Sequence, residues 1–288
     1  MANVRHIKQR IGTAKNISKI TKAMEMVSAS KMRRAQEQTL AARPYAEALI
    51  AAMIQLNQEA PQHLHPLLSR HDVGVPILII ISTDRGLCGS LNQNLFKQVT
   101  AWHRLHPQGQ YIIVGKKAVS FAQFVGLPIY AQFTNLPDKI SLKDVLPIST
   151  LIMEHFSNQD FASVDIVFTD FINTLSQKTN RQRILPIQEP RDSEMTLSPE
   201  AHKEYVFEPN AKDLLSELLP YYVENAVYQA FLEAKASEHS ARMVAMKNAS
   251  ENAKDLVTEL LLVYNKSRQE SITSEILDIS TASMTLEQ

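Results

Sequence analysis

Apolar residues recur every three or four positions near the start of the chain. Ile7, Ile11 and Ala14 step by four and three, and similar steps continue to Leu56. The later members of this stripe are Ile17, Ile20, Met24, Val27, Tyr45, Leu49 and Ala52. The spacing is that of one face of a helix and is close to a heptad. It predicts a helix over residues 3–57 that Pro44 kinks or divides.

The end of the chain carries a similar pattern. Tyr221 to Gln288 contains neither glycine nor proline, the two residues that interrupt helices. Its apolar stripe comprises Val227, Phe231, Ala234, Met243, Met246, Ala249, Ala253, Leu256, Leu260 and Tyr264. A helix over 210–288 is too long to stand alone, so we expect an antiparallel coiled coil with residues 1–57. The stripe thins after Tyr264, so pairing should stop near Lys266 although the helix continues.

Residues 76–209 alternate between β-type apolar runs and amphipathic stretches, and residues 58–75 read as a linker. The expected strands are 76–82, 111–114, 128–130, 164–169, 171 onward to a polar turn, 184–187 and 205–207. The expected helices are 92–105, 116–125 and 141–156. Alternating strands and helices are typical of a Rossmann-like α/β layer. The predicted fold class is therefore α/β, with this domain inserted into a long antiparallel coiled coil of N- and C-terminal helices.

Charge is distributed unevenly although the formal net charge is zero. Residues 1–34 contain nine Lys or Arg and one acid, whereas residues 221–288 contain six Lys or Arg and ten acids. A basic helix is thus expected beside an acidic one. The basic segment lacks interleaved aromatic residues, so we expect an acidic protein surface as its counterpart and no nucleic acid.

Composition also limits the compartment and the membrane topology. Cys88 is the only cysteine, which excludes an intrachain disulfide and fits a reducing compartment. No apolar run approaches the ~18 residues of a membrane span, and the N-terminus lacks the apolar core of a signal peptide.

Histidines cluster in the linker at positions 63, 65 and 71. They have no acidic or sulfur partner at defined spacing, so solvated loop histidines are expected and no metal site.

The loop after the first strand contains Asp84, Arg85, Gly86, Cys88 and Gly89. It is placed like a phosphate cradle but matches neither the P-loop nor the dinucleotide pattern. We interpret the loop as a tight turn that buries the Cys88 thiol. Asp84 and Arg85 would form a local ion pair or an edge at which another protein docks. No catalytic motif is present, so we expect neither a catalytic residue nor a cofactor.

Three motifs carry a family resemblance. They are residues 20–31 (ITKAMEMVSASK), residues 82–92 (STDRGLCGSLN), and residues 237–249 (SEHSARMVAMKNA) with 264–269 (YNKSRQ) and 272–276 (ITSEI). Over essentially its whole length the chain resembles the gamma subunit of bacterial F-type ATP synthase. One departure is that residues 278–283 lack the glycine usual near the family's C-terminus.

The resemblance implies a non-catalytic rotor shaft of the F1 sector. Its paired helices would pass through the ring of three alpha and three beta subunits, and rotation driven by ion flow would cycle the catalytic sites on beta. The α/β domain would form a foot that contacts epsilon and the c-ring of Fo. Such a chain would lie at the cytoplasmic face of the bacterial inner membrane, attached only indirectly.

The resemblance also implies contacts to beta loops along the shaft. The matching positions are Lys22, Met24, Arg242, Gln269, Thr273 and Glu275. The residues alone leave a second hypothesis open, an independent coiled-coil scaffold with an α/β binding domain. Co-purification with alpha and beta subunits distinguishes the two.

Overall fold

The computed structural model describes residues 2–59, 65–71, 73–187 and 211–286. The chain divides into two compact units. The terminal unit comprises residues 1–28 and 242–288, and the central unit comprises residues 29–241. The two longest helices each contribute residues to both units.

These helices are α1 (Ala2–Glu59) and α5 (Ala211–Leu286), of 58 and 76 residues. The predicted pair of long terminal helices is confirmed. Pro44 lies inside α1, and no new helix starts there. Pro220 lies inside α5, and beyond it no glycine or proline interrupts the helix, in keeping with its length.

The central unit is built on a five-stranded sheet with the order β3-β2-β1-β4-β5. Its strands are β1 (Val75–Ile81), β2 (Gln110–Val114), β3 (Ile129–Phe133), β4 (Phe161–Phe171) and β5 (Gln177–Leu185). β1, β2, β3 and β4 are parallel, and β5 pairs antiparallel with β4 at one edge. The crossovers are α2 (Leu91–Leu105), α3 (Lys116–Val125) and α4 (Leu142–Ser157). The predicted Rossmann-like insert is confirmed.

Apolar layers cover both faces of the sheet, as the continuous apolar runs in β1 and β2 require. On one face, Leu78 and Ile80 pack with residues of α2 and α3 around the fully buried Trp102. On the other face, Ile77 and Ile79 pack with α4 and with the first part of α5. The α5 side chains in that layer are Leu215, Leu219, Val223, Val227, Ala230 and Phe231.

The hairpin of β4 and β5 differs from the prediction of a polar turn that extends to residue 183. β4 continues to Phe171, the turn covers only residues 172–176, and β5 begins at Gln177. The polar segment from Gln177 to Arg183 is a strand because an edge strand pairs through its backbone whatever its side chains. The strand expected at 205–207 lies outside the described residues.

The segment at residues 65–71 is more ordered than a linker of solvated histidines. Leu67 is 2% exposed and its carbonyl accepts a hydrogen bond from the N–H of Ile187. His65 Nδ1 accepts from the N–H of Leu67, and burial lowers the pKa of His65. The His71 ring lies 4.6 Å from that of Phe156. The prediction of solvated side chains was therefore wrong for His65 and His71, and His63 lies outside the described residues.

Candidate functional site

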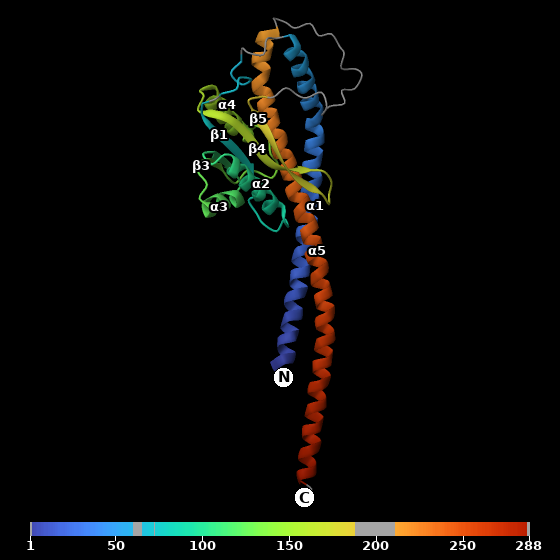
Figure 1. Cartoon of the computed structure of the whole chain (residues 1–288). Coiled ribbons are helices and arrows are strands. Elements are labelled where there is room, and N and C mark those ends of the chain that lie inside the picture. Colours follow the sequence, from blue (N-terminus) through green and yellow to red (C-terminus); the bar gives the residue numbers. More distant parts are fainter. Residues whose placement is uncertain (1, 60–64, 72, 188–210, 287–288) are drawn as a thin grey trace. The chain divides into compact units, whose positions relative to one another are not determined.

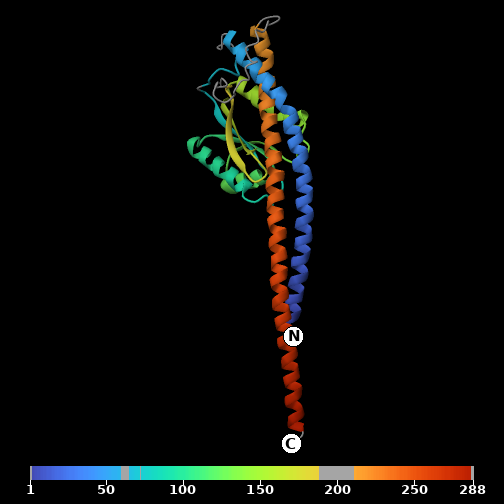
Figure 2. The same cartoon turned by 90° about the vertical axis from the view of Figure 1, so that its right-hand side faces the viewer.

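In the terminal unit, α1 and α5 lie side by side in opposite directions (Figure 1 and Figure 2). The least exposed positions on each helix alternate in steps of four and three, as in a coiled coil. On α1 this seam contains Ile7, Ile11, Ala14, Ser18, Thr21, Glu25 and Ser28. On α5 it contains Met246, Ser250, Ala253, Val257, Leu260, Tyr264, Ser267 and Ser271.

The seam changes character along its length. Near the N-terminus it is apolar, where Ile7 and Ile11 pack with Leu260. Further along it is polar, and Ser18 and Ser250 exchange hydrogen bonds. Each hydroxyl donates to the other residue's carbonyl oxygen, over 3.4 Å from Ser18 and 3.3 Å from Ser250. Small side chains let the backbones approach closely enough for this exchange.

The predicted stripe was wrong for several members. Ile17, Ile20 and Val27 on α1 are 47%, 60% and 55% exposed, and Leu256 on α5 is 42% exposed. Ser250, outside the predicted stripe, is 2% exposed. The reason is that α1 carries two stripes at helical spacing. From Ala14 to Ser28 the stripe that faces α5 is small and polar, whereas Ile17, Ile20 and Val27 lie on the exposed side.

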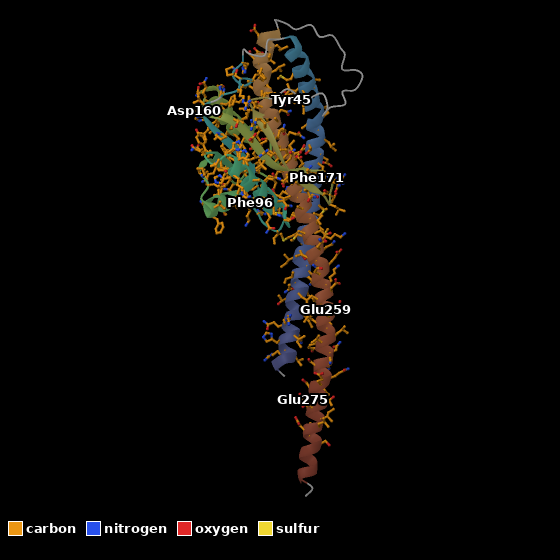
Figure 3. All side chains as sticks on the ribbon, viewed as in Figure 1. Tyr45, Phe96, Asp160, Phe171, Glu259 and Glu275 are labelled. Carbon is orange, nitrogen blue, oxygen red and sulfur yellow. The ribbon has the colours of Figure 1, made fainter. Side chains whose placement is uncertain are left out.

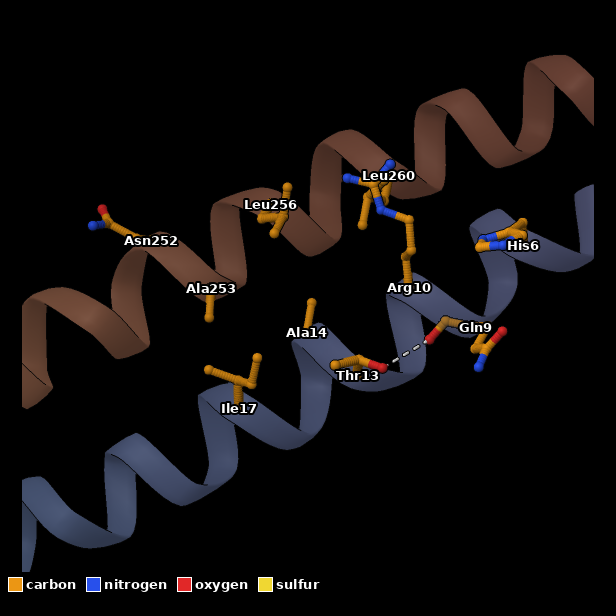
Figure 4. Close-up of a pocket in the computed structure, with 10 residues that line it drawn as sticks. All are labelled: His6, Gln9, Arg10, Thr13, Ala14, Ile17, Asn252, Ala253, Leu256 and Leu260. Carbon is orange, nitrogen blue, oxygen red and sulfur yellow. Dashed lines mark hydrogen bonds between the residues drawn. The ribbon is translucent and has the colours of Figure 1, made fainter. Parts of the chain in front are cut away.

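A groove of about 460 Å³ opens on the terminal unit beside Ala14 and Ala253 (Figure 4). Both alanines lie in the seam, and their short side chains leave space that Ile17, Leu256 and Leu260 border. The rim is polar, formed by His6, Gln9, Arg10, Thr13 and Asn252. No acid lines this groove, so its outer edge is basic.

The end of α5 continues past the start of α1. A second groove, of about 490 Å³, is lined by Arg5 and Lys8 of α1 and by Tyr264 and Arg268 of α5. From position 272 to 280 every side chain is exposed. Figure 3 shows the Glu275 region as a single helix with side chains projecting on both sides. The expectation that pairing ends before the helix does is confirmed, but the predicted limit near Lys266 was too early, because Ser267 and Ser271 still lie in the seam.

The residues predicted to contact beta loops lie in three settings. Lys22 is exposed and pairs with Glu25 at 2.9 Å, and Met24 is half-buried next to the polar seam. Gln269, Thr273 and Glu275 are exposed on the distal part of α5. Arg242, by contrast, is only 8% exposed.

The loop after β1 is closed by its own hydrogen bonds. Asn92 Nδ2 donates to Thr83 Oγ1 at 2.8 Å and to Cys88 Sγ at 3.4 Å. Cys88 is 3% exposed, which confirms the buried thiol. Gly89 has φ +61°, a conformation that favours glycine. Sequence reasoning missed Asn92, although it stands at the end of the motif at residues 82–92.

The loop after β1 also holds the start of α3, the helix that follows β2. The first N–H groups of a helix are the usual anion donors. Here Lys116 N–H donates to Asp84 Oδ1, Lys117 N–H to the Thr83 carbonyl and Ala118 N–H to Ser82 Oγ. Asp84 thus acts as a cap for α3, and these donors are already occupied.

Two ion pairs in the central unit were not predicted. Lys31 of α1 donates to Asp138, which follows β3, and this hydrogen bond holds the pKa of Asp138 below its usual value. Asp165 of β4 is 3% exposed and accepts from Trp102 Nε1 at 2.9 Å and from Arg183 Nε at 2.7 Å. Both partners are distant in sequence, so spacing carried no signal for either pair.

Among the described residues, no three His, Cys, Asp or Glu side chains are arranged to hold a metal ion. None of the described helices is long and apolar enough to cross a bilayer.

Comparison with known proteins identifies the family. The model of the family described as ATP synthase matches residues 3–286. The ATP synthase gamma chain of Dehalococcoides mccartyi strain 195 is 45% identical over 284 residues, with 97% of each chain covered. That of Herpetosiphon aurantiacus is 43% identical over 300 residues, with 100% of each chain covered. The chain belongs to the ATP synthase gamma chains. Members of this family are non-catalytic subunits that form the central stalk of F1.

Solved structures share the gamma-chain fold. A chain of the Euglena gracilis mitochondrial ATP synthase, in the OSCP/F1/c-ring assembly in rotational state 3, superposes with a TM-score of 0.70 at 22% identity. That match covers 99% of this chain and 95% of the other. A chain of the Tetrahymena thermophila mitochondrial central stalk/c-ring structure gives a TM-score of 0.59 at 24% identity, covering 80% of this chain and 99% of that one.

Proposed function

We propose that this gamma chain is the rotating shaft that couples ion flow through Fo to the catalytic cycle of the beta subunits in F1. The observation that carries the proposal is the distal part of α5. From position 272 to 280 every side chain is exposed, although Ile272, Ile276, Leu277 and Ile279 are large and apolar. Exposed apolar surface of this size is typical of a segment that works inside an assembly.

Coupling requires that each orientation of the shaft stabilises a different conformation of each beta subunit. The terminal unit has the asymmetry for this. α1 presents exposed cations, such as Arg5, Lys8 and Lys15, alongside exposed Ile17 and Ile20. The distal part of α5 presents Glu270 and Glu275 among apolar residues. A surrounding ring therefore meets a different surface at α1 from the one it meets at the distal part of α5.

Contacts to beta loops are proposed at Lys22 and Met24 on α1 and at Gln269, Thr273 and Glu275 on α5. Their exposure, complete or partial, supports the proposal. Arg242 belongs to the same proposal with an added requirement. Its guanidinium must become more accessible in the complex than its 8% exposure in the free chain.

We further propose that the α/β domain is the foot, which contacts epsilon and the c-ring, and that alpha subunits complete the ring around the shaft. The loop at residues 84–89 would lie on this foot. The bacterial relatives support a location at the cytoplasmic face of the inner membrane, where Fo provides the attachment. The alternative of an independent scaffold is less well supported, because identity to gamma chains extends over 97% of the chain.

Co-purification tests the proposal. The tagged full-length chain, expressed with the other subunits of its own organism, should recover alpha and beta in a complex that hydrolyses ATP. A variant with Ile272, Ile276 and Ile279 replaced by Asp should recover less of the ring, whereas Ser274→Asp, at an exposed polar position nearby, should not. Recovery of the chain only by itself would contradict the shaft function.

A further inference from the structure

The groove beside Ala14 and Ala253, on the terminal unit, combines apolar walls with one cation. Its volume of about 460 Å³ lies within the range of pockets that bind small molecules. Arg10 is the only Arg or Lys that lines it, and no Asp or Glu does. Half of the ten lining residues are apolar, namely Ala14, Ile17, Ala253, Leu256 and Leu260. The groove therefore has the composition of a small-molecule site, with mostly apolar walls and a few polar groups.

The basic residues and the apolar residues of the groove lie towards opposite ends. Figure 4 shows Arg10 and His6 towards one end, and Ile17 and Ala253 towards the other. Arg10 and Ile17 are about two turns apart on α1, which is about 10 Å along the helix axis. A ligand that fills the groove lengthwise would thus meet a cation at one end and apolar side chains at the other.

Arg10 is available to such a ligand. Its side chain is exposed, and it takes part in none of the salt bridges within the part of the chain that the structure describes. A guanidinium keeps its charge at every physiological pH and can donate two parallel hydrogen bonds to a carboxylate. Because the groove holds a single such cation, charge complementarity favours a ligand with one anionic head group.

The second groove on this unit provides a contrast. Its volume is similar, about 490 Å³, but half of its eight lining residues are charged. They are Arg5, Lys8, Arg268 and Glu275. An apolar chain laid over these groups would remove water from them without replacing its hydrogen bonds, which is costly. We therefore expect an amphiphile to prefer the groove at Ala14 and Ala253.

We propose that this groove binds a free medium-chain carboxylate. The head group accepts hydrogen bonds from the Arg10 guanidinium, and the alkyl chain lies over Ala14 and Ala253 between Ile17 and Leu256. Burial of the chain and the charge of the head group both contribute to affinity. The site is formed by α1 and α5 alone, so it does not depend on the proposed shaft function.

Decanoate is a suitable probe for the full chain with labelled Ile, Leu and Ala methyl groups, at concentrations below those at which it forms micelles. NMR should show saturable shifts at Ile17, Ala253 and Leu256, and none at Ile20 or Ile272, which do not line this groove. A fully buried methylene raises affinity about fourfold, so the shorter hexanoate should bind at least about tenfold more weakly even if each methylene is only partly buried. Decyltrimethylammonium should bind at least about fivefold more weakly than decanoate, because attraction to the cation becomes repulsion.

Two variants test the two ends of the groove. Arg10→Gln keeps a hydrogen-bonding side chain without the charge and should weaken decanoate binding about fivefold, the upper range for an exposed ion pair. Arg5→Gln is its control, because it removes an exposed cation of α1 that lines only the second groove. Ile17→Asn removes an apolar wall and should also weaken binding about fivefold. Ile20→Asn, at a more exposed position outside the groove, should not.

All four positions are exposed, so the variants should fold, and circular dichroism checks that they do. Absence of shifts at Ile17 up to the concentration at which decanoate forms micelles would overturn the proposal. So would shifts of equal size at Ile20 or Ile272, or equal affinity for decyltrimethylammonium. Unchanged affinity in both Arg10→Gln and Ile17→Asn would show that decanoate binds elsewhere.

Discussion

Ser18 and Ser250 each donate a hydroxyl hydrogen bond to the other's backbone carbonyl oxygen, which joins α1 to α5 within the terminal unit. The exchange needs close backbones and leaves no room for a large side chain. It marks the polar middle of a seam whose end near the N-terminus is apolar. The contacts that stabilise the helix pair are therefore apolar near the N-terminus of α1 and hydrogen-bonded further along it.

Ser250→Leu should destabilise the terminal helix pair. A leucine at a 2% exposed position must separate the helices, which costs about 1–3 kcal/mol. Thermal unfolding followed by circular dichroism measures the change. Glu251→Leu is the matched control, because position 251 is exposed and should tolerate the same side chain. Equal effects at the two positions would contradict the close approach.

Removing the end of α5 should leave the free chain nearly as stable as before. Positions 272 to 280 are exposed, so truncation after Ser271 removes little buried surface. The melting temperature should fall by less than about 2 °C, since about 1 kcal/mol corresponds to a few degrees in a chain of this size. Amide hydrogen exchange in the same segment should be fast in the free chain and slow in the F1 complex. Slow exchange in both would contradict the proposal that its contacts lie on other subunits.

Met24→Lys should impair coupling more than assembly. If Met24 faces an acidic beta loop, the new cation forms an attraction that must break at every rotation step. ATP-driven proton pumping in membrane vesicles should fall more than ATP hydrolysis does. Ala23→Lys adds the same charge one residue away at an exposed position, and it should have a smaller effect.

Arg183→Ala should destabilise the central unit by about 3 kcal/mol. The buried Asp165 carboxylate would then keep its hydrogen bond from the Trp102 indole N–H but lose its counter-ion. Removing one partner of a buried ion pair typically costs about 3–5 kcal/mol. Arg181→Ala, on the same strand at an exposed position, is the control. Urea unfolding measures both, and similar losses would argue against the buried pair.

Asp138→Asn should lower stability at neutral pH but not in acid. The folded pKa of Asp138 is depressed, chiefly by its hydrogen bond with Lys31. The stabilisation that the Asp138 carboxylate provides is therefore fully present above the pKa of this group in the unfolded chain. It is lost as the pH falls through the pKa of the group in the folded chain. Because the carboxylate is 57% exposed, solvent screening limits the loss to about 0.2–1 kcal/mol. Unfolding at pH 7 and at pH 3 tests this, with Asp278→Asn as an exposed control.

Local patterns were sufficient for most of the fold. The absence of glycine and proline from the sequence after Pro220 predicted the helix α5 in that region. Continuous apolar runs predicted the strands β1 and β2. The strand at Gln177 was missed because pairing at a sheet edge depends on the neighbouring strand and not on apolar side chains. Among the site residues, the family motifs predicted Arg242 as a contact to another subunit. Nothing in the sequence indicated that Arg242 is only 8% exposed.

The sequence by itself determined that two long helices flank an α/β domain, and that the last turns of α5 outlast their partner. Only the tertiary structure decided which side of α1 faces α5. Ile17, Ile20 and Val27 have the helical spacing of a core stripe, yet Ser18 and Ser28 take the inner positions. Periodicity reports that a face is apolar, but it cannot distinguish burial against the same chain from burial against another subunit. Steric fit between the two backbones makes that choice, and it favours the small side chains.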